Sequence, residues 1–155
     1  MRRLAILAGV AACALALADV AWPTIAIGRG IAGLSLGMSQ AAVRARLGKP
    51  VTVVRGTNEF GAYTELRYRG YVVVLQGNTR TTSIVTTLAR EKTPAGIGVG
   101  STWSQVHSKV PHVRCEGSAR LGDCHVGVLL PGRKVTNFSV LGGKVNRVVV
   151  GIVLD

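Results

Sequence analysis

The chain has 155 residues, of which 48% are apolar and only 5% aromatic, and its 19 Lys and Arg against 7 Asp and Glu give a formal net charge of +12. This length allows one ordinary domain or two very small ones and excludes larger multidomain architectures. The positive charge can attract anionic partners or can simply keep the protein soluble. No basic run exceeds two residues, which excludes a polybasic arm, indicates no specific nucleic-acid target and favours solubility as the interpretation of the charge.

Residues 1–18 have the layout of a secretory signal peptide. Two arginines open the chain, an uncharged apolar run covers 4–18, and "ALA" at 16–18 gives a small-x-small cleavage pattern. The run is short for a membrane anchor, which takes about 20 residues. We therefore expect cleavage after Ala18, no transmembrane span in the mature form, and a secreted, periplasmic or cell-envelope location. "VAAC", which ends at Cys13, resembles a lipoprotein box, so lipidation of Cys13 is the less favoured alternative.

Residues 19–32 are interpreted as a linker. They run into "GRGIAG", residues 28–33, which matches the dinucleotide-binding pattern G-x-G-x-x-G. That pattern requires a βαβ unit and an acidic residue near position 50 to hold the ribose, and the sequence offers neither. We therefore predict no nucleotide cofactor.

Residues 33–91 and 92–155 are interpreted as two repeat modules. "GLSLGMSQAAV" at 33–43 is similar to "GIGVGSTWSQV" at 96–106, at an offset of 63, and further matches follow at an offset of 66. Internal duplication of this kind constrains architecture strongly.

Each module is predicted to begin with a short helix. Ser39 is a candidate N-cap of the first helix, and Thr102 with Gln105 forms a capping-box pattern at the second. Pro50 and Pro111 mark where the two helices end. Helices of about three turns do not persist alone in water, so each must pack against a sheet.

Four strands are predicted after each helix, because runs rich in Val, Thr and Tyr are separated by turn dipeptides such as Arg69-Gly70. The predicted strands cover 51–55, 63–68, 71–76 and 82–89 in the first module, and 112–117, 123–130, 133–141 and 145–154 in the second. The expected fold class is α+β, with two tandem helix plus antiparallel-sheet repeats packed together.

"LGMSQAAVRARLGKP", residues 36–50, resembles the "GMT…V…G" opening of the β-lactamase inhibitor protein repeat. It also resembles the small lipoprotein of the outer-membrane β-barrel assembly machine, the SmpA/OmlA group. The resemblance implies a helix before an antiparallel sheet, an exported tandem repeat, and a contact surface on a concave sheet rich in aromatic residues. "VPHVRCEGSARLGDCHV", residues 110–126, is similar to the family's cysteine pair after the helix, although the first module has no such pair.

Cys115 and Cys124 are the two cysteines left after removal of the signal peptide, and export favours their oxidation to a disulfide. A zinc site is the alternative, because His112 and His125 accompany the cysteines as further ligands. Adjacent residues of a strand point to opposite faces, so Cys124 and His125 do not converge. We therefore predict a disulfide and no metal cofactor.

The candidate partner surface consists of Tyr63, Glu65, Arg67 and Arg69, at alternating positions of one predicted strand, with Tyr71 beyond the turn. Tyr and Arg are favoured at interfaces. The alternative is an ordinary solvated sheet face.

The acidic residues form no obvious catalytic pair, and the adjacency of His107 and Ser108 is no signal for a triad, which assembles in space. The sequence thus predicts an exported, non-catalytic binding module, protein-binding or inhibitor-like, that acts through its sheet face. The first alternative is a cell-envelope component attached to anionic polymer or membrane by positive charge. The second is a small metal-binding protein or enzyme that uses the His/Cys group.

Overall fold

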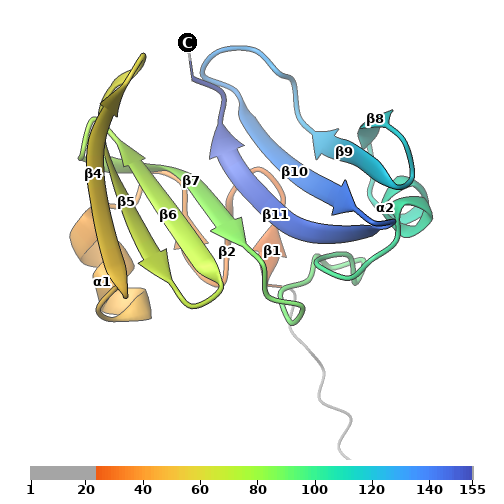
Figure 1. Ribbon diagram of the computed structural model, residues 1–155, viewed down its shortest axis with the longest axis horizontal. Helices are drawn as coiled ribbons and strands as arrows, with labels where there is room; N and C mark the ends of the chain where they lie inside the picture. Colours follow the sequence, from red (N-terminus) through yellow and green to blue (C-terminus); the bar gives the residue numbers. More distant parts are fainter. Residues whose placement is uncertain (1–23, 155) are drawn as a thin grey trace, which may run out of the picture.

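A single eight-stranded antiparallel sheet dominates the computed structural model, which describes residues 24–154 (Figure 1). The predicted signal peptide 1–18, Cys13 and the start of the predicted linker lie outside the described residues. The strand order is β4-β5-β6-β7-β11-β10-β9-β8. The strands are β4 (Thr52–Asn58), β5 (Gly61–Tyr68), β6 (Tyr71–Gln76), β7 (Arg80–Thr86), β8 (Arg114–Gly117), β9 (Leu121–Val126), β10 (Lys134–Leu141) and β11 (Lys144–Ile152).

Within the described residues there are two helices, α1 (Gln40–Leu47) and α2 (Trp103–Lys109). The predicted caps are confirmed. The Ser39 hydroxyl accepts a hydrogen bond from the Ala42 N–H at 3.2 Å, and Thr102 and Gln105 bond each other's backbone N–H in a full capping box. Each helix buries one valine completely, Val43 or Val106, against the sheet.

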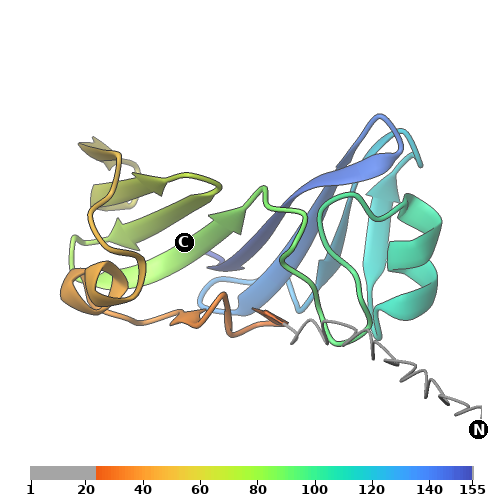
Figure 2. The same cartoon turned by 90° about the horizontal axis from the view of Figure 1, so that it is seen from below.

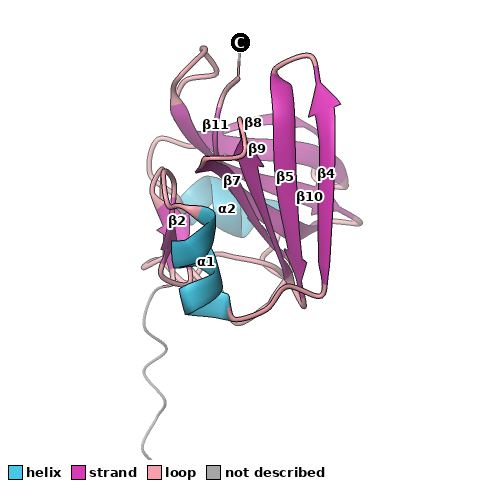
Figure 3. Cartoon of the chain, turned by 90° about the vertical axis from the view of Figure 1, so that its left-hand side faces the viewer, coloured by secondary structure: helices cyan, strands magenta, loops and turns pink. Residues whose placement is uncertain are grey.

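The predicted α+β class of two packed repeats is wrong, because the chain is mainly β. The two helices have only 8 and 7 residues, and they lie beside a sheet of eight strands that makes up most of the structure (Figure 3). The strands of the two predicted repeats, β4–β7 and β8–β11, also do not form two separate sheets. Strands β7 and β11 pair antiparallel over Ser83–Thr86 and Val148–Gly151, so that both edges are satisfied by backbone hydrogen bonds and the halves form one sheet.

A second, three-stranded sheet occupies part of the segment predicted as a linker. Its strands are β1 (Ile25–Ala26), β2 (Gly30–Ile31) and β3 (Leu34–Ser35). Ile25, Ile31 and Leu34 are at most 1% exposed and belong to the core. The segment is therefore part of the folded unit, because its aliphatic side chains are buried against the large sheet.

The glycines of "GRGIAG" have a structural use in this small sheet. A Cβ at Gly30 would lie 1.8 Å from the Leu34 carbonyl oxygen, and Gly28 and Gly33 have positive φ angles of 66° and 77°. Only glycine allows that approach and adopts those angles readily. The G-x-G-x-x-G match is thus explained by close packing and tight turns.

The large sheet has one covered and one open face. Both helices and β1–β3 lie on the same side of it (Figures 1 and 2). Successive side chains of each strand point to opposite sides of the sheet. Those on the covered side include five completely buried residues, Leu66, Val73, Ile84, Val148 and Val150. No described element covers the opposite side, which we call the open face.

Candidate binding surface and the buried Tyr71–Glu91 pair

Three residues of the predicted partner surface lie together on the open face. Tyr63, Glu65 and Arg67 alternate on β5 with the buried Thr64 and Leu66. Because successive side chains of a strand point to opposite sides of the sheet, the three share the open face as the sequence predicted.

Valines fill the centre of the open face. In β6, Val72 and Val74 stand opposite Arg67 and Glu65 of β5. Val72 also pairs with Val85 of β7, which pairs with Val149 of β11, so the row crosses the junction between the two halves. We call Val72, Val74, Val85 and Val149 the valine strip. All four are half-buried, which leaves an apolar centre partly accessible to a partner.

Charged side chains flank the valine strip on the β5 side. The Arg67 Nε donates to Glu65 Oε1 at 2.5 Å, and the two side chains are 53% and 20% exposed. This hydrogen bond and the charge of Glu65 raise the pKa of Arg67, which therefore stays a cation. An exposed ion pair of this kind adds little to stability, but it fixes a cation and an anion beside the apolar centre.

A polar network flanks the strip on the other side. The Asp123 carboxylate accepts hydrogen bonds from Asn137 Nδ2 at 2.8 Å and from Ser139 Oγ at 2.7 Å. These bonds hold the pKa of Asp123 below its usual range. The Arg147 Nε donates to Ser139 Oγ at 3.1 Å. Register places these residues on the open face, beside Val149, which pairs with Asn137.

The remaining two predicted partner residues are not part of this surface. Arg69 lies in the exposed turn between β5 and β6. Tyr71 is only 7% exposed and points to the covered side. The two-residue turn at 69–70 pairs Tyr71 directly with Tyr68. Paired residues point to the same side of the sheet, so Tyr71 lies on the covered side with Tyr68, and Arg67 lies on the open face. The assignment of Tyr71 to the partner surface is therefore corrected.

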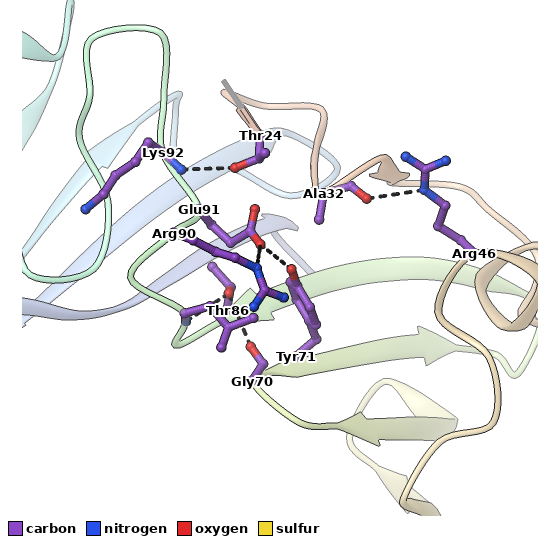
Figure 4. A network of polar contacts seen from close by, with 10 residues as sticks. Thr24, Ala32, Arg46, Gly70, Tyr71, Thr86, Arg90, Glu91 and Lys92 are labelled. Atoms are coloured by element: carbon purple, nitrogen blue, oxygen red, sulfur yellow. Dashed lines mark hydrogen bonds and ion pairs between the residues drawn. The ribbon is translucent and has the colours of Figure 1, made fainter. Parts of the chain in front are cut away.

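Tyr71 instead belongs to a buried polar cluster (Figure 4). Its hydroxyl donates to Glu91 Oε1, which also accepts from the Arg90 Nε at 3.2 Å. Glu91 is 2% exposed, and its Oε2 has no hydrogen-bond partner among the described residues. Burial, and then the bond to Glu91, raise the pKa of Tyr71. Sequence reasoning missed Glu91, because no pattern around it marks a lone carboxylate as buried.

A cavity of about 840 Å³ adjoins this cluster. Its lining includes Tyr71 and Glu91 together with three arginines, Arg29, Arg46 and Arg90. The Arg46 Nε donates to the Ala32 carbonyl at 3.4 Å, which holds that side chain over the small sheet. The arginines give the cavity a positive rim around a buried carboxylate.

We expect Tyr71→Phe to lower the free energy of unfolding by about 1–3 kcal/mol, because it removes a buried donor from Glu91 and leaves the carboxylate less compensated. Urea denaturation at neutral pH measures the change. Tyr68→Phe is the matched control, since the Tyr68 hydroxyl donates to the Gly48 carbonyl at 3.3 Å from a more exposed position. Equal losses in the two variants would contradict a special role for the Tyr71–Glu91 pair.

The predicted disulfide is confirmed, since Cys115 and Cys124 are bonded to each other. Disulfides persist in oxidising compartments outside the cytosol.

In residues 24–154 no group of three or more His, Cys, Asp or Glu side chains could hold a metal ion. The Ser108 hydroxyl, next to His107, donates to the Ser104 carbonyl of its own helix at 2.8 Å. Neither helix of the described chain has the length and apolar character needed to span a bilayer.

Comparison with known proteins identifies the fold alone. No family model and no curated protein matches the chain. One similar solved structure is the DUF4309 family protein YjgB of Bacillus subtilis, with 17% identity, a TM-score of 0.51, and coverage of 81% of this chain and 88% of that one. Another is an extracellular protein containing a SCP domain from Bacillus anthracis, with 10% identity and a TM-score of 0.54 over 92% of this chain. The match spans half of that second protein.

Proposed function

We propose that the chain is an exported, non-catalytic protein-binding module that contacts its partner through the open face of the eight-stranded sheet. The valine strip, set between the Glu65–Arg67 pair and the Asp123 network, is the observation that carries this proposal. Protein interfaces combine an apolar centre with a polar, solvent-accessible rim, and the open face has that arrangement.

Export is part of the proposal. The predicted signal peptide 1–18 and the disulfide support a secreted, periplasmic or cell-envelope protein. The resemblance of residues 36–50 to the β-lactamase inhibitor protein repeat supports an inhibitor-like action, in which a sheet face covers part of another protein. The open face of this chain offers valines where that family offers aromatic side chains, so the partner it selects differs in shape.

The test is affinity capture of a partner from the host's secreted and envelope fractions, with the wild type and open-face variants as baits. We expect Val74→Glu, which places a charge in the valine strip, to lose the partner that the wild type retains. Arg44→Ala is the matched control on α1, because Arg44 is exposed on the covered side and should leave capture unchanged.

Two results would overturn the proposal. One is capture of the same protein by wild type and Val74→Glu, since an apolar contact does not survive a buried, unpaired charge. The other is release of every captured component at high ionic strength, which would indicate attachment by net charge instead of by the open face.

A further inference from the structure

The loop between β9 and β10, residues 127–133, displays three consecutive apolar side chains to solvent. Val128, Leu129 and Leu130 are 50%, 55% and 56% exposed. The loop lies at the same end of the molecule as the C-terminus (Figure 1). Single exposed leucines are ordinary, but a contiguous exposed apolar group indicates an interaction site.

Main-chain bonds hold this loop in place. The Arg133 N–H donates to the Leu130 carbonyl at 3.0 Å, which closes a tight turn at the tip. The Gly132 N–H donates to the Val153 carbonyl at 2.8 Å, and the Val153 N–H donates to the Arg133 carbonyl at 2.9 Å. At the other end of the loop, a Cβ on Gly127 would lie 2.5 Å from the Lys134 carbonyl oxygen. These main-chain hydrogen bonds hold the backbone that carries the three exposed apolar side chains.

Two cations follow the apolar tip in the chain and line the same hollow. Arg133 and Lys134 are both exposed, and they line a hollow of about 630 Å³ together with Val128 and Leu130. Apolar side chains and cations therefore face one shared space. That combination matches the boundary of a bilayer, where acyl chains meet anionic head groups.

We infer that residues 127–134 form a membrane-surface site, in which Leu129 and Leu130 insert among lipid tails while Arg133 and Lys134 bind lipid phosphates. A bilayer suits this tip better than a protein does, because a stable protein interface buries about 800 Å² on each partner and three side chains cannot supply that area. The inference shares the predicted export with the proposed function but uses a different surface.

The first experiment is co-sedimentation of the protein with vesicles of phosphatidylcholine containing phosphatidylglycerol, and with vesicles of phosphatidylcholine alone. We expect preferential binding to the anionic vesicles, and a partition coefficient reduced about tenfold or more in the double variant Leu129→Ser with Leu130→Ser. The matched control is Leu121→Ser with Leu141→Ser. That pair is 67% and 60% exposed and lies at the opposite end of β10, so its replacement should leave binding unchanged.

The second experiment reports on the loop itself, whatever other part of the chain meets the membrane. A tryptophan introduced by Leu129→Trp should be quenched by brominated phosphatidylcholine in anionic vesicles. A tryptophan introduced by Val51→Trp should not be quenched, because Val51 is 72% exposed and directly precedes β4, at the edge of the sheet opposite β8.

The inference is overturned if both tryptophans are quenched equally or neither is quenched. It is also overturned if the loop variant binds anionic vesicles as well as the wild type. A loss of self-association in the loop variant, seen by light scattering, with unchanged vesicle binding would assign the loop to a protein contact instead. Because the open-face variant Val74→Glu retains this loop, it should bind vesicles normally, which separates this inference from the proposed function.

Discussion

Replacing Phe138 by Ala should lower the free energy of unfolding by about 3–5 kcal/mol, the largest change we expect from one substitution. Phe138 is the largest fully buried side chain among residues 24–154. It lies in β10 between Cys124 of β9 and Val148 of β11, and all three are 0% exposed. Its removal leaves a cavity in the core of the C-terminal half. The loss is large because the whole free energy of unfolding of a domain is only about 5–15 kcal/mol.

Guanidinium denaturation followed by far-ultraviolet circular dichroism measures this loss. Phe60→Ala is the matched control, because Phe60 is 38% exposed in the β4–β5 turn and its replacement should cost less than about 1 kcal/mol. A loss for Phe138→Ala no larger than that of Phe60→Ala would show that the C-terminal half is not packed around Phe138.

Removing the disulfide should be the second-largest effect, at about 2.5–3 kcal/mol on the loop-entropy model for cysteines 9 residues apart. The bond joins β8 to β9 in register. Strand β8 has four residues and lies at the edge of the sheet, so it has strand neighbours on one side alone. Once the bridge is absent, β8 should fray before the rest of the sheet unfolds.

The measurement compares the oxidised wild type, the reduced wild type and the double variant Cys115→Ala with Cys124→Ala. Reduction should destabilise the wild type and leave the double variant unchanged, which serves as its control. Hydrogen exchange should show lost protection in residues 114–117 of the reduced chain, while β6 and β7 remain protected. Identical unfolding curves for oxidised and reduced wild type would contradict the prediction.

Local signals in the sequence predicted local structure well. Ser39 and Thr102 begin helices because capping depends on side chains within three residues of each other. The shared face of Tyr63, Glu65 and Arg67 follows from strand alternation alone. These predictions need no knowledge of what lies elsewhere in the chain.

The predictions that were wrong concern features that depend on contacts between residues far apart in the sequence. Strands of two residues, such as β1 and β2, have no periodicity to detect, and their burial depends on the large sheet beneath them. The pairing of β7 with β11 joins residues more than 60 positions apart, which no local pattern encodes. Tyr71 was assigned to the wrong face because the two-residue turn at 69–70 pairs it with Tyr68, and the phase of the next strand follows from that pairing.

The order of strands in the sheet has a consequence for how this protein folds. Strand β11 is the last of the described strands along the sequence, yet it lies at the middle of the sheet beside β7. Until residues 144–152 have formed β11, the edge of β7 that β11 covers is therefore unpaired. Unpaired edges invite aggregation, so we expect the folding chain to be most prone to aggregation before β11 pairs with β7.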